Sequence, residues 1–332
     1  MPELIEVSII SEQLNNMISN IFDDKRELIF CNILSGKFLK KPIINWDIFQ
    51  YFIETSKLKI DRVYNKGKLI IIQFEKPKPK SNMCEVIFEE EESKERDIIL
   101  QKIDKEPYIY MLITLGMSGS ITEQKEKHSR VEFKLNDKFE YNTFYYNDIR
   151  SFGNIYIMLT ERELNIHLNK IGKPLPIDGF GNQIIHPINK VEFINNTKRN
   201  PNKFLVDALM DQKTICSGIG NYLQNEIMYV AKLNPYVMIK ELTDVQINTV
   251  FDISLDIIKD SYKYGGVSIK DYKDINNKKG TYQDHIKIYR KKLDPLGNKI
   301  VSIVGPHNRT SWYCEAIQGS VPLRCQNKAF SR

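Results

Sequence analysis

The sequence predicts an α+β protein: an N-terminal helix and an antiparallel β-sandwich, followed by a helical region that ends in a β-hairpin. Three observations lead to this fold class. Residues 3–21 repeat apolar side chains at helical spacing, residues 58–160 fall into short runs rich in Ile, Tyr, Phe and Val, and the pattern is helical again from residue 202. A chain of 332 residues can form two domains, each with its own core.

The N-terminal half reads as one helix and a series of strands. The helix presents Ile5, Ile9, Ile10, Leu14, Met17, Ile18 and Ile21 on one face. Strands are predicted at 69–74, 108–115, 131–135, 143–146 and 155–158, with Gly and Asn-Asp turns between them. Residues 75–107 interrupt the sheet with Pro77, Pro79, a lysine cluster and four consecutive glutamates, so a charged surface insertion is expected there.

The C-terminal half reads as helices and a hairpin. Helices are predicted at 204–210, 221–231 and 243–262, a tight turn at Gly218-Ile219-Gly220, and a hairpin at 285–316 whose first turn is Asp294-Pro295-Leu296-Gly297-Asn298. Several Pro, Gly and Asn residues between 172 and 201 indicate an interdomain linker. The expected organisation is an N-terminal domain at 1–175, a linker at 176–200, a helical domain at 201–282, the hairpin at 283–318 and a tail at 319–332.

Charge, hydrophobicity and cysteine content bear on the partners and the compartment of the protein. Lys and Arg total 48 against 42 Asp and Glu, a net charge of +6, which is compatible with a polyanionic partner. No stretch approaches the roughly 20 apolar residues of a membrane span, so no membrane association is expected. The N-terminus is acidic and does not read as a secretory signal. Five scattered cysteines, none spaced as Cys-x-x-Cys, favour an intracellular protein without disulfides.

The N-terminal residues Met1-Pro2-Glu3 can carry chemistry. Proline in second position favours removal of Met1, which would leave a free secondary amine on Pro2. An α-amino group titrates near pKa 8, so a useful fraction is neutral and nucleophilic at pH 7. Attack of this amine on an aldehyde-level carbon gives an iminium ion, and Glu3 could serve as general acid or base. The structural alternative is a helix that begins with proline and early acidic residues.

Four further motifs point to one family. They are Gly67-Lys68, Leu115-Gly116-Met117-Ser118-Gly119, Asp148-Ile149-Arg150-Ser151-Phe152-Gly153, and Leu209-Met210-Asp211-Gln212-Lys213 followed by Gly218-Ile219-Gly220-Asn221-Tyr222-Leu223. Together with Met1-Pro2-Glu3-Leu4-Ile5-Glu6-Val7, they resemble the formamidopyrimidine-DNA glycosylase / endonuclease VIII family, in the family's order, from residue 1 to about 318. One departure is Ile5, which stands where the family has a second proline.

The resemblance implies a role for each matching residue. Pro2 would be the Schiff-base nucleophile, Glu3 would protonate the sugar, and Lys68 would reach the sugar and phosphate of the damaged nucleotide. After the base is flipped out, Met117, Phe152 and Arg150 would fill the gap, with Arg150 bonding the orphaned base. A place in the sandwich core is the alternative for Met117 and Phe152. His128, Lys213 and Asn221 would contact DNA, the last two from a helix–two-turn–helix element.

The C-terminal hairpin resembles the family's zinc finger but lacks its ligands. Ile288-Tyr289-Arg290 and Asn308-Arg309-Thr310-Ser311-Trp312-Tyr313-Cys314 match its two halves, and Arg309 falls on the arginine that grips phosphates beside the lesion. Zinc needs four N or S ligands, and only Cys314 remains of the four cysteines. A zincless finger is therefore expected, with no metal and no organic cofactor.

Taken together, the resemblance implies a bifunctional DNA glycosylase and abasic-site lyase of base excision repair, acting as a monomer on damaged double-stranded DNA with β,δ-elimination. The alternative is a non-catalytic protein that binds damaged DNA or DNA junctions on the same fold. Gly-Asn-Tyr-Leu and the zincless finger favour oxidised pyrimidines and formamidopyrimidines over 8-oxoguanine. Against this, residues 268–289 resemble, without gaps, the family segment that carries a loop over 8-oxoguanine.

Overall fold

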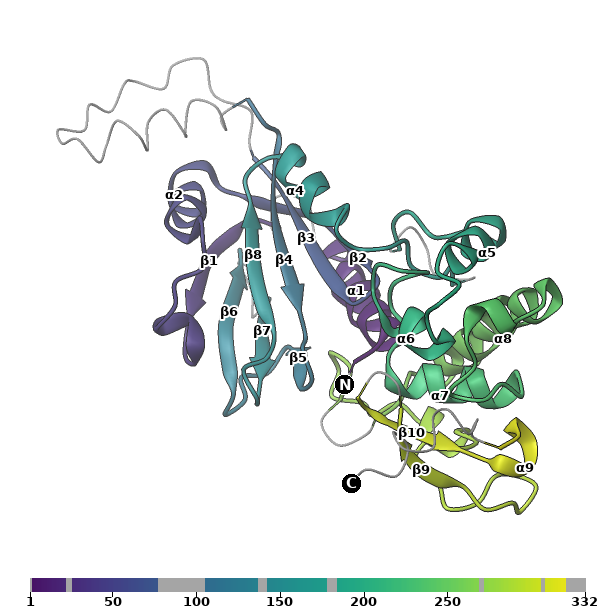
Figure 1. Ribbon diagram of the computed structural model, residues 1–332. Coiled ribbons are helices and arrows are strands. Elements are labelled where there is room, and N and C mark those ends of the chain that lie inside the picture. Colours follow the sequence, from purple (N-terminus) through teal and green to yellow (C-terminus); the bar gives the residue numbers. More distant parts are fainter. Residues whose placement is uncertain are drawn as a thin grey trace.

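In the computed structural model, a β-sandwich domain and a helical domain meet at the start of the first helix (Figure 1). The structure describes residues 2–21, 26–76, 105–136, 142–177, 184–268, 272–305 and 308–320. Most of the insertion expected at 75–107 and most of the tail expected at 319–332 therefore lie outside the described residues. No helix of the described part is long and apolar enough to cross a membrane.

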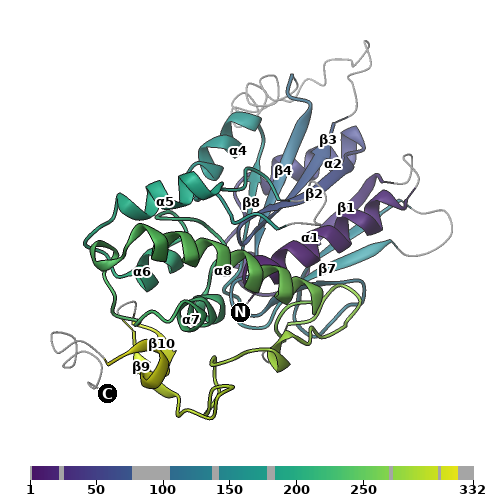
Figure 2. The same cartoon turned by 90° about the vertical axis from the view of Figure 1, so that its right-hand side faces the viewer.

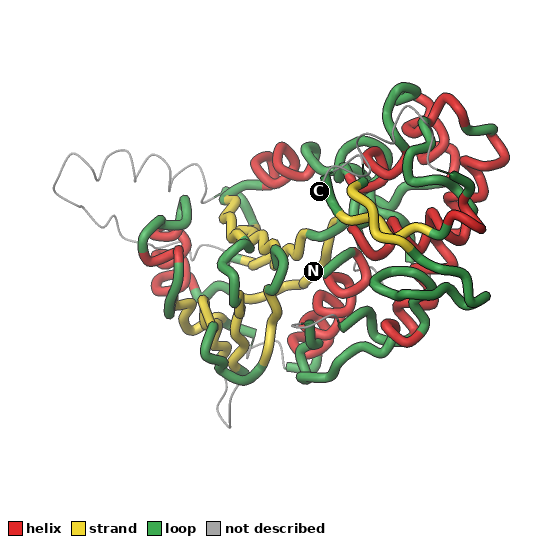
Figure 3. The backbone as a smooth tube through the Cα atoms, turned by 60° about the horizontal axis from the view of Figure 1, so that its bottom comes forward, coloured by secondary structure: helices red, strands yellow, loops and turns green. Residues whose placement is uncertain are grey.

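Helix α1 (Leu4–Ser19) belongs to both domains. Leu4 and Ile5 pack into the core of the helical domain, whereas Leu14 and Ile18 pack into the core of the sandwich. Figure 3 shows the N-terminus between the strands on one side and most of the helices on the other. The helical spacing of its apolar residues predicted this helix, but not that Val7 and Ile10 join the sandwich core while the neighbouring Ile9 joins the core of the helical domain.

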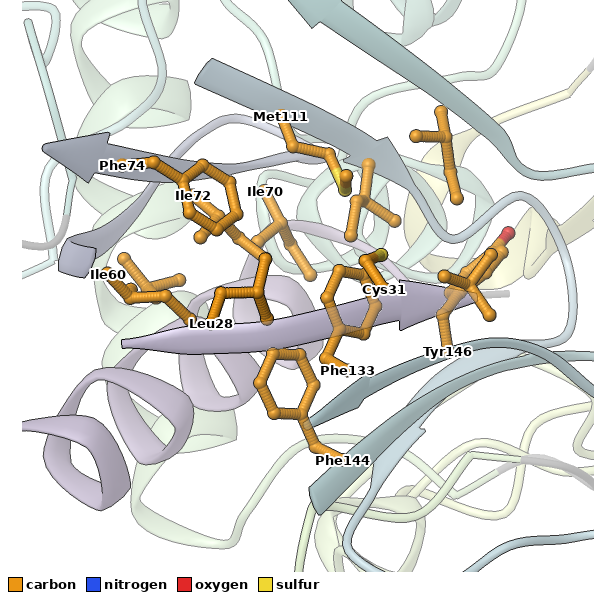
Figure 4. Packing of buried hydrophobic residues seen from close by; sticks show 14 of the residues in the cluster. Leu28, Cys31, Ile60, Ile70, Ile72, Phe74, Met111, Phe133, Phe144 and Tyr146 are labelled. Atoms are coloured by element: carbon orange, nitrogen blue, oxygen red, sulfur yellow. The ribbon is translucent and has the colours of Figure 1, made fainter. Parts of the chain in front are cut away.

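The sandwich consists of two four-stranded antiparallel sheets in the described residues, with strand orders β1-β6-β7-β5 and β2-β3-β4-β8. Apolar side chains from both sheets fill the space between them (Figure 4). The rings of Phe133 and Phe144, for example, stack with centroids 4.5 Å apart. The strands are β1 (Leu28–Ile33), β2 (Lys59–Lys66), β3 (Leu69–Glu75), β4 (Tyr108–Thr114), β5 (Gly119–Thr122), β6 (Ser129–Leu135), β7 (Thr143–Asp148) and β8 (Asn154–Met158).

All five predicted strands are present, as β3, β4, β6, β7 and β8. The sequence pattern did not single out β1, β2 or β5. Strand β1 exposes about every third side chain, and β5 has only four residues, so neither shows a clear alternation. Two helices of this half were also missed, namely α2 (Trp46–Ser56) and α4 (Glu161–Leu168), together with the short 3-10 helix η2 (Lys37–Leu39).

The helical domain is organised around α8 (Asp244–Lys263), which contacts α1, α5 and α7 (Figure 2). The predicted helices are present as α6 (Leu205–Met210), α7 (Asn221–Val230) and α8. The segment 176–200, expected to be a linker, contains helix α5 (Lys190–Lys198), which begins with a capping box formed by Asn189 and Glu192. The short 3-10 helices η3 (Ile239–Glu241) and η4 (Tyr282–Asp284) complete this part.

The finger is a two-stranded sheet of β9 (Val301–Val304) and β10 (Thr310–Tyr313), followed by α9 (Glu315–Gln318). The turn at Asp294 precedes this hairpin and is closed by a bridge between Leu293 and Lys299. The predicted hairpin region at 285–316 thus holds one short ladder and one separate turn.

Candidate active site

Pro2 and Glu3 are buried at the point where the first turn of α1 meets the turn before α7. The backbone N–H of Leu4 donates to the carbonyl of Gly218 at 3.0 Å, which fixes the start of the chain against the helical domain. Pro2 also lines a cavity of about 300 Å³ on the sandwich side. The residue predicted to be the nucleophile is therefore held in place rather than exposed on a loose end.

The Glu3 carboxylate accepts three backbone hydrogen bonds from the first residues of α7. The donors are the N–H groups of Gly220 at 2.7 Å, Tyr222 at 2.9 Å and Leu223 at 3.3 Å. Helix N-termini leave such N–H groups without intrahelical partners and carry partial positive charge. Glu3 therefore joins the predicted catalytic centre directly to the predicted DNA-binding helix.

Two glycines permit this close approach. A Cβ on Gly220 would lie 2.3 Å from Cδ of Glu3, so any larger residue would displace the carboxylate. Gly218 has φ of +103°, and a Cβ there would lie 2.7 Å from Cβ of Leu4. The motif Gly218-Ile219-Gly220 is thus required by the packing of residues 3 and 4 as well as by the turn itself.

Burial raises the pKa of Glu3 to about 7; the Lys68 ammonium opposes this rise and the neighbouring Glu6 carboxylate adds to it. Glu6 is equally buried and accepts from the Glu3 N–H at 2.7 Å, the Val267 N–H at 2.8 Å and the Tyr222 hydroxyl at 3.1 Å. Burial raises the pKa of Glu6 as well. A carboxyl group with a pKa near 7 can both give and take a proton at neutral pH.

Lys68 is the second residue of the β2–β3 turn, whose first residue, Gly67, has φ of +59°. Its Nζ donates to the carbonyl of Ile219 at 2.8 Å, beside the Glu3 cap. Burial lowers the pKa of Lys68, the Glu3 carboxylate acts in the opposite direction, and the Arg309 guanidinium lowers it further. The structure therefore brings four predicted site residues together at one place: Pro2, Glu3, Lys68 and Arg309.

The predicted gap-filling residues lie on two loops that touch each other. Met117 is 42% exposed and Phe152 57% exposed, so the alternative of a place in the sandwich core is excluded for both. Arg150 is exposed beside them. A Cβ on Gly116 would meet the backbone of Gly153 at 2.7 Å, which shows how closely the two loops approach.

Asp148 holds these two loops together, a role that the motif alone did not reveal. Its carboxylate accepts from the Ser118 hydroxyl at 3.0 Å in one loop and from the Arg150 and Gly153 N–H groups at 3.2 and 2.7 Å in the other. The Asp148 N–H also donates to the carbonyl of His128 at 3.1 Å, which puts the predicted phosphate contact beside the same loops.

The turn before α7 is braced by Gln212. Its side chain donates to the carbonyl of Ile219 at 2.9 Å and accepts from the Gly218 N–H at 2.8 Å. Lys213 is exposed on this turn. The side chain of Asn221, the first residue of α7, donates to the carbonyl of Thr310 in the finger at 3.1 Å.

Two buried carboxylates hold the finger: Glu226 of α7 bonds the segment that leads into it, and Asp294 bonds the turn that precedes its hairpin. Glu226 accepts the backbone N–H groups of Lys287, Ile288 and Tyr289 at 2.8 to 3.0 Å, so it bonds backbone rather than facing outwards. Asp294 accepts from Asn298, Leu296, the Tyr229 hydroxyl and, at 3.4 Å, the Cys314 thiol. Among the described residues, no group of three or more His, Cys, Asp or Glu side chains could hold a metal ion.

Comparison with known proteins agrees with this geometry. The family model described as the formamidopyrimidine-DNA glycosylase N-terminal domain matches residues 1–155, and the model described as the H2TH domain of the same enzyme matches residues 181–273. The chain belongs to the formamidopyrimidine-DNA glycosylase / endonuclease VIII family.

Its similarity to individual members of the family is moderate. A formamidopyrimidine-DNA glycosylase of Wolbachia pipientis from Culex pipiens is 27% identical over 215 residues, which cover 63% of this chain and 74% of the relative. One from Mycoplasma genitalium is 27% identical over 214 residues, covering 62% and 70%. The Fpg protein of Lactococcus lactis, solved in complex with DNA containing an abasic site, superposes with a TM-score of 0.69 at 19% identity, covering 96% of this chain and all of that one. At that identity the last likeness shows the fold alone.

Three residues to which the sequence assigned no role also contribute to the site. Glu6 and Asp148 bond groups far away in sequence, the Tyr222 hydroxyl and the Ser118 hydroxyl, whereas Gln212 braces the turn that follows it through Gly218 and Ile219. All three lie inside the family motifs, and the position of a polar side chain within a motif was the available signal. Where the family has a zinc finger, this chain has Asp294 and apolar packing around Cys314 and Ile300.

Proposed function

We propose that this protein is a bifunctional DNA glycosylase and abasic-site lyase of base excision repair that uses Pro2 as its nucleophile. The observation that carries the proposal is the placement of Glu3. Its carboxyl group lies beside Pro2, has a pKa near 7, and is bonded to the first turn of α7. Binding of DNA alone would require neither a buried carboxyl group with this pKa nor a lysine close to it.

The proposed chemistry begins with loss of Met1 and attack of the neutral Pro2 amine on C1′ of the damaged nucleotide. The C1′–N bond breaks, the base leaves with a proton, and the opened sugar is held as an iminium ion. Glu3 supplies the proton for opening of the sugar ring and can take it back. Loss of the C2′ proton to Glu3 or water converts the iminium into an enamine, which expels the 3′ phosphate by β-elimination. Loss of the C4′ proton in the same way then lets the conjugated iminium expel the 5′ phosphate by δ-elimination. Hydrolysis then frees Pro2, and the scheme needs neither metal nor organic cofactor.

In this proposal the DNA is bent and the lesion is flipped out of the duplex. The loop residues Met117 and Phe152 enter the gap, and Arg150 bonds the unpaired base. Their exposure on two loops tied by Asp148 supports this role. Phosphate contacts are assigned to His128, Lys213, Asn221 and Arg309.

For the lesion, we propose oxidised pyrimidines and formamidopyrimidines in preference to 8-oxoguanine. The Gly-Asn-Tyr-Leu form of residues 220–223 and the finger without the family's zinc ligands support this preference through the sequence resemblance. Part of the opposing segment at 268–289, namely residues 269–271, lies outside the described residues.

The proposal can be tested by borohydride trapping on duplexes that contain an abasic site, thymine glycol or 8-oxoguanine, with Pro2→Gly as the comparison. We expect a covalent adduct with the wild type and none with Pro2→Gly, and a higher yield with thymine glycol than with 8-oxoguanine. Mass spectrometry should show that Met1 is absent. No adduct on any substrate from a protein that lacks Met1 would leave a DNA-binding protein without lyase chemistry.

A further inference from the structure

The cavity beside Pro2 extends away from the α7 cap, towards the sandwich and the end of α4. Its volume is about 300 Å³. The β2–β3 turn, the end of β4, β8, α4 and the turn before α7 each contribute to its wall. The polar side chains in that wall are those of Lys66, Lys68, Thr114, Tyr156, His167 and Gln212.

Lys66 is an unusual residue to find in such a wall. It is only 6% exposed, and its Nζ donates to the carbonyl of Leu168 at 2.8 Å. It forms no ion pair with any described residue. Buried lysines are almost always paired with an anion, because an isolated buried charge is costly. The Leu168 carbonyl at the end of α4 offers only the partial negative charge of a helix C-terminus.

Other cationic and donor groups converge on the same space. Lys66 and Lys68 flank Gly67 at the turn, and both line the cavity. His167 lines it from the last turn of α4, with its ring 5.0 Å from that of Tyr156. Burial lowers the pKa of Lys66, and Lys173 lowers it further, so an anion in the cavity would relieve an existing electrostatic penalty.

We propose that the cavity is a phosphate subsite, in which Lys66 and His167 hold a phosphate group of the strand that is being cut. The inference rests on the proposed function, since it takes Pro2 as the point where the sugar is attached. A phosphate fits because it is a compact anion that accepts several charge-assisted hydrogen bonds at once. The phosphate is either a phosphodiester of the intact strand or the terminal phosphate left by elimination, and the chemistry of the contact is the same.

The test is a binding competition with the full-length protein, in which no chemical step is needed. Three duplexes are compared: one with an intact tetrahydrofuran site, one with a gap bounded by phosphates, and one with the same gap bounded by hydroxyls. We expect the wild type to prefer the phosphate-bounded gap over the hydroxyl-bounded gap about tenfold or more, and Lys66→Met to lose that preference. A loss of affinity that is also seen on the tetrahydrofuran duplex would identify an internal phosphodiester as the ligand.

Lys170→Met is the matched control, because it removes the same charge from an exposed residue next to His167. It should leave the preference within about twofold, as expected for a screened surface charge. If Lys66→Met does not fold, as judged by thermal unfolding, His167→Ala is measured in the same way and should weaken the preference several-fold.

The proposal is overturned if a folded Lys66→Met protein binds all three duplexes as the wild type does; Lys66 would then only cap α4. Failure of this subsite is distinguishable from failure of the proposed function. A wild type that discriminates phosphate ends but gives no borohydride adduct has the subsite without the lyase, and one that gives the adduct without discrimination has the lyase without the subsite.

Discussion

The junction of α1 with α7 and the finger both depend on buried carboxylates, but they satisfy them in different ways. At the junction, Glu3 accepts three backbone N–H groups from a region more than 200 residues away in sequence, and glycine is required for it to approach. In the finger, Asp294 bonds mainly its own turn, where Gly297 has no atom within 4 Å of its would-be Cβ. The first arrangement is long-range and crowded, whereas the second is local and open.

The pKa values of the two carboxyl groups are shifted in opposite directions. Burial dominates at Glu3 and raises its pKa to about 7. Burial also acts on Asp294, but the hydrogen bonds from Asn298, Tyr229 and Cys314 outweigh it and lower the pKa to about 2. The junction therefore favours a carboxyl group that can exchange its proton at neutral pH, and the finger favours a carboxylate that stays ionised. A catalytic role suits the first and a structural role suits the second.

The largest effect should come from filling the space at the junction. In Gly220→Ala the backbone conformation stays allowed, yet the new Cβ would lie 2.3 Å from Cδ of Glu3. We expect a loss of about 3 kcal/mol in the free energy of unfolding and a loss of about 100-fold in glycosylase activity. Gly297→Ala is the control: it meets no neighbouring atom, and its φ of +83° should cost only about 1 kcal/mol. Equal effects in denaturant titrations would show that the two regions are not packed differently.

A smaller effect should appear in the pH dependence of stability. The pKa of Glu3 is about 7 in the folded protein against an ordinary value of 4.5, so the folded state binds this proton more tightly than the unfolded chain does. The contribution of Glu3 to the free energy of unfolding should therefore be greatest below pH 4.5 and fall, by on the order of 3 kcal/mol, as the pH rises to about 7. Glu3→Gln should reduce this slope, leaving the part that comes from Glu6, whose pKa burial also raises, and Glu123→Gln, at an exposed position, should leave the whole slope unchanged. A slope of unchanged size in Glu3→Gln would assign the proton to another group.

The smallest effect should come from the finger. Asp294 is stabilising in its ionised form, so its contribution should be lost only as the pH falls from 3.8 towards about 2. Asp294→Asn, measured at pH 7, should loosen the turn and weaken DNA binding by roughly tenfold through the displacement of Arg309.

Treatment of the wild type with a strong chelator should leave its DNA affinity unchanged. A loss of affinity after chelation would show that the finger contains a metal after all.

The sequence predicted the elements whose apolar residues repeat at a clear spacing and the site residues that lie in family motifs. The apolar spacing of residues 3–21 predicted α1, and the order of the motifs predicted Pro2, Glu3, Lys68 and Arg309, which the structure brings together. Their detailed roles stay predictions.

What the sequence did not yield depends on long-range contacts. Nothing in the pattern of residues 28–33 distinguishes an edge strand from a loop, and nothing around Asp148 shows that it bonds two separate loops. The same holds for Lys66, whose burial follows from the position of α4 and not from its own neighbours in the chain.

Helix α1 places apolar side chains in both cores, Leu4, Ile5 and Ile9 in one and Val7, Ile10, Leu14 and Ile18 in the other, so the two domains share one continuous helix. Movement of the domains about Pro2 would break contacts of this helix in one core or the other. The distortion needed to present a flipped nucleotide must then come almost wholly from the duplex, so that lesions in easily bent sequence steps should be engaged most readily. The protein would keep its conformation on binding, and the ease with which a duplex bends would influence which DNA is bound before any base is recognised.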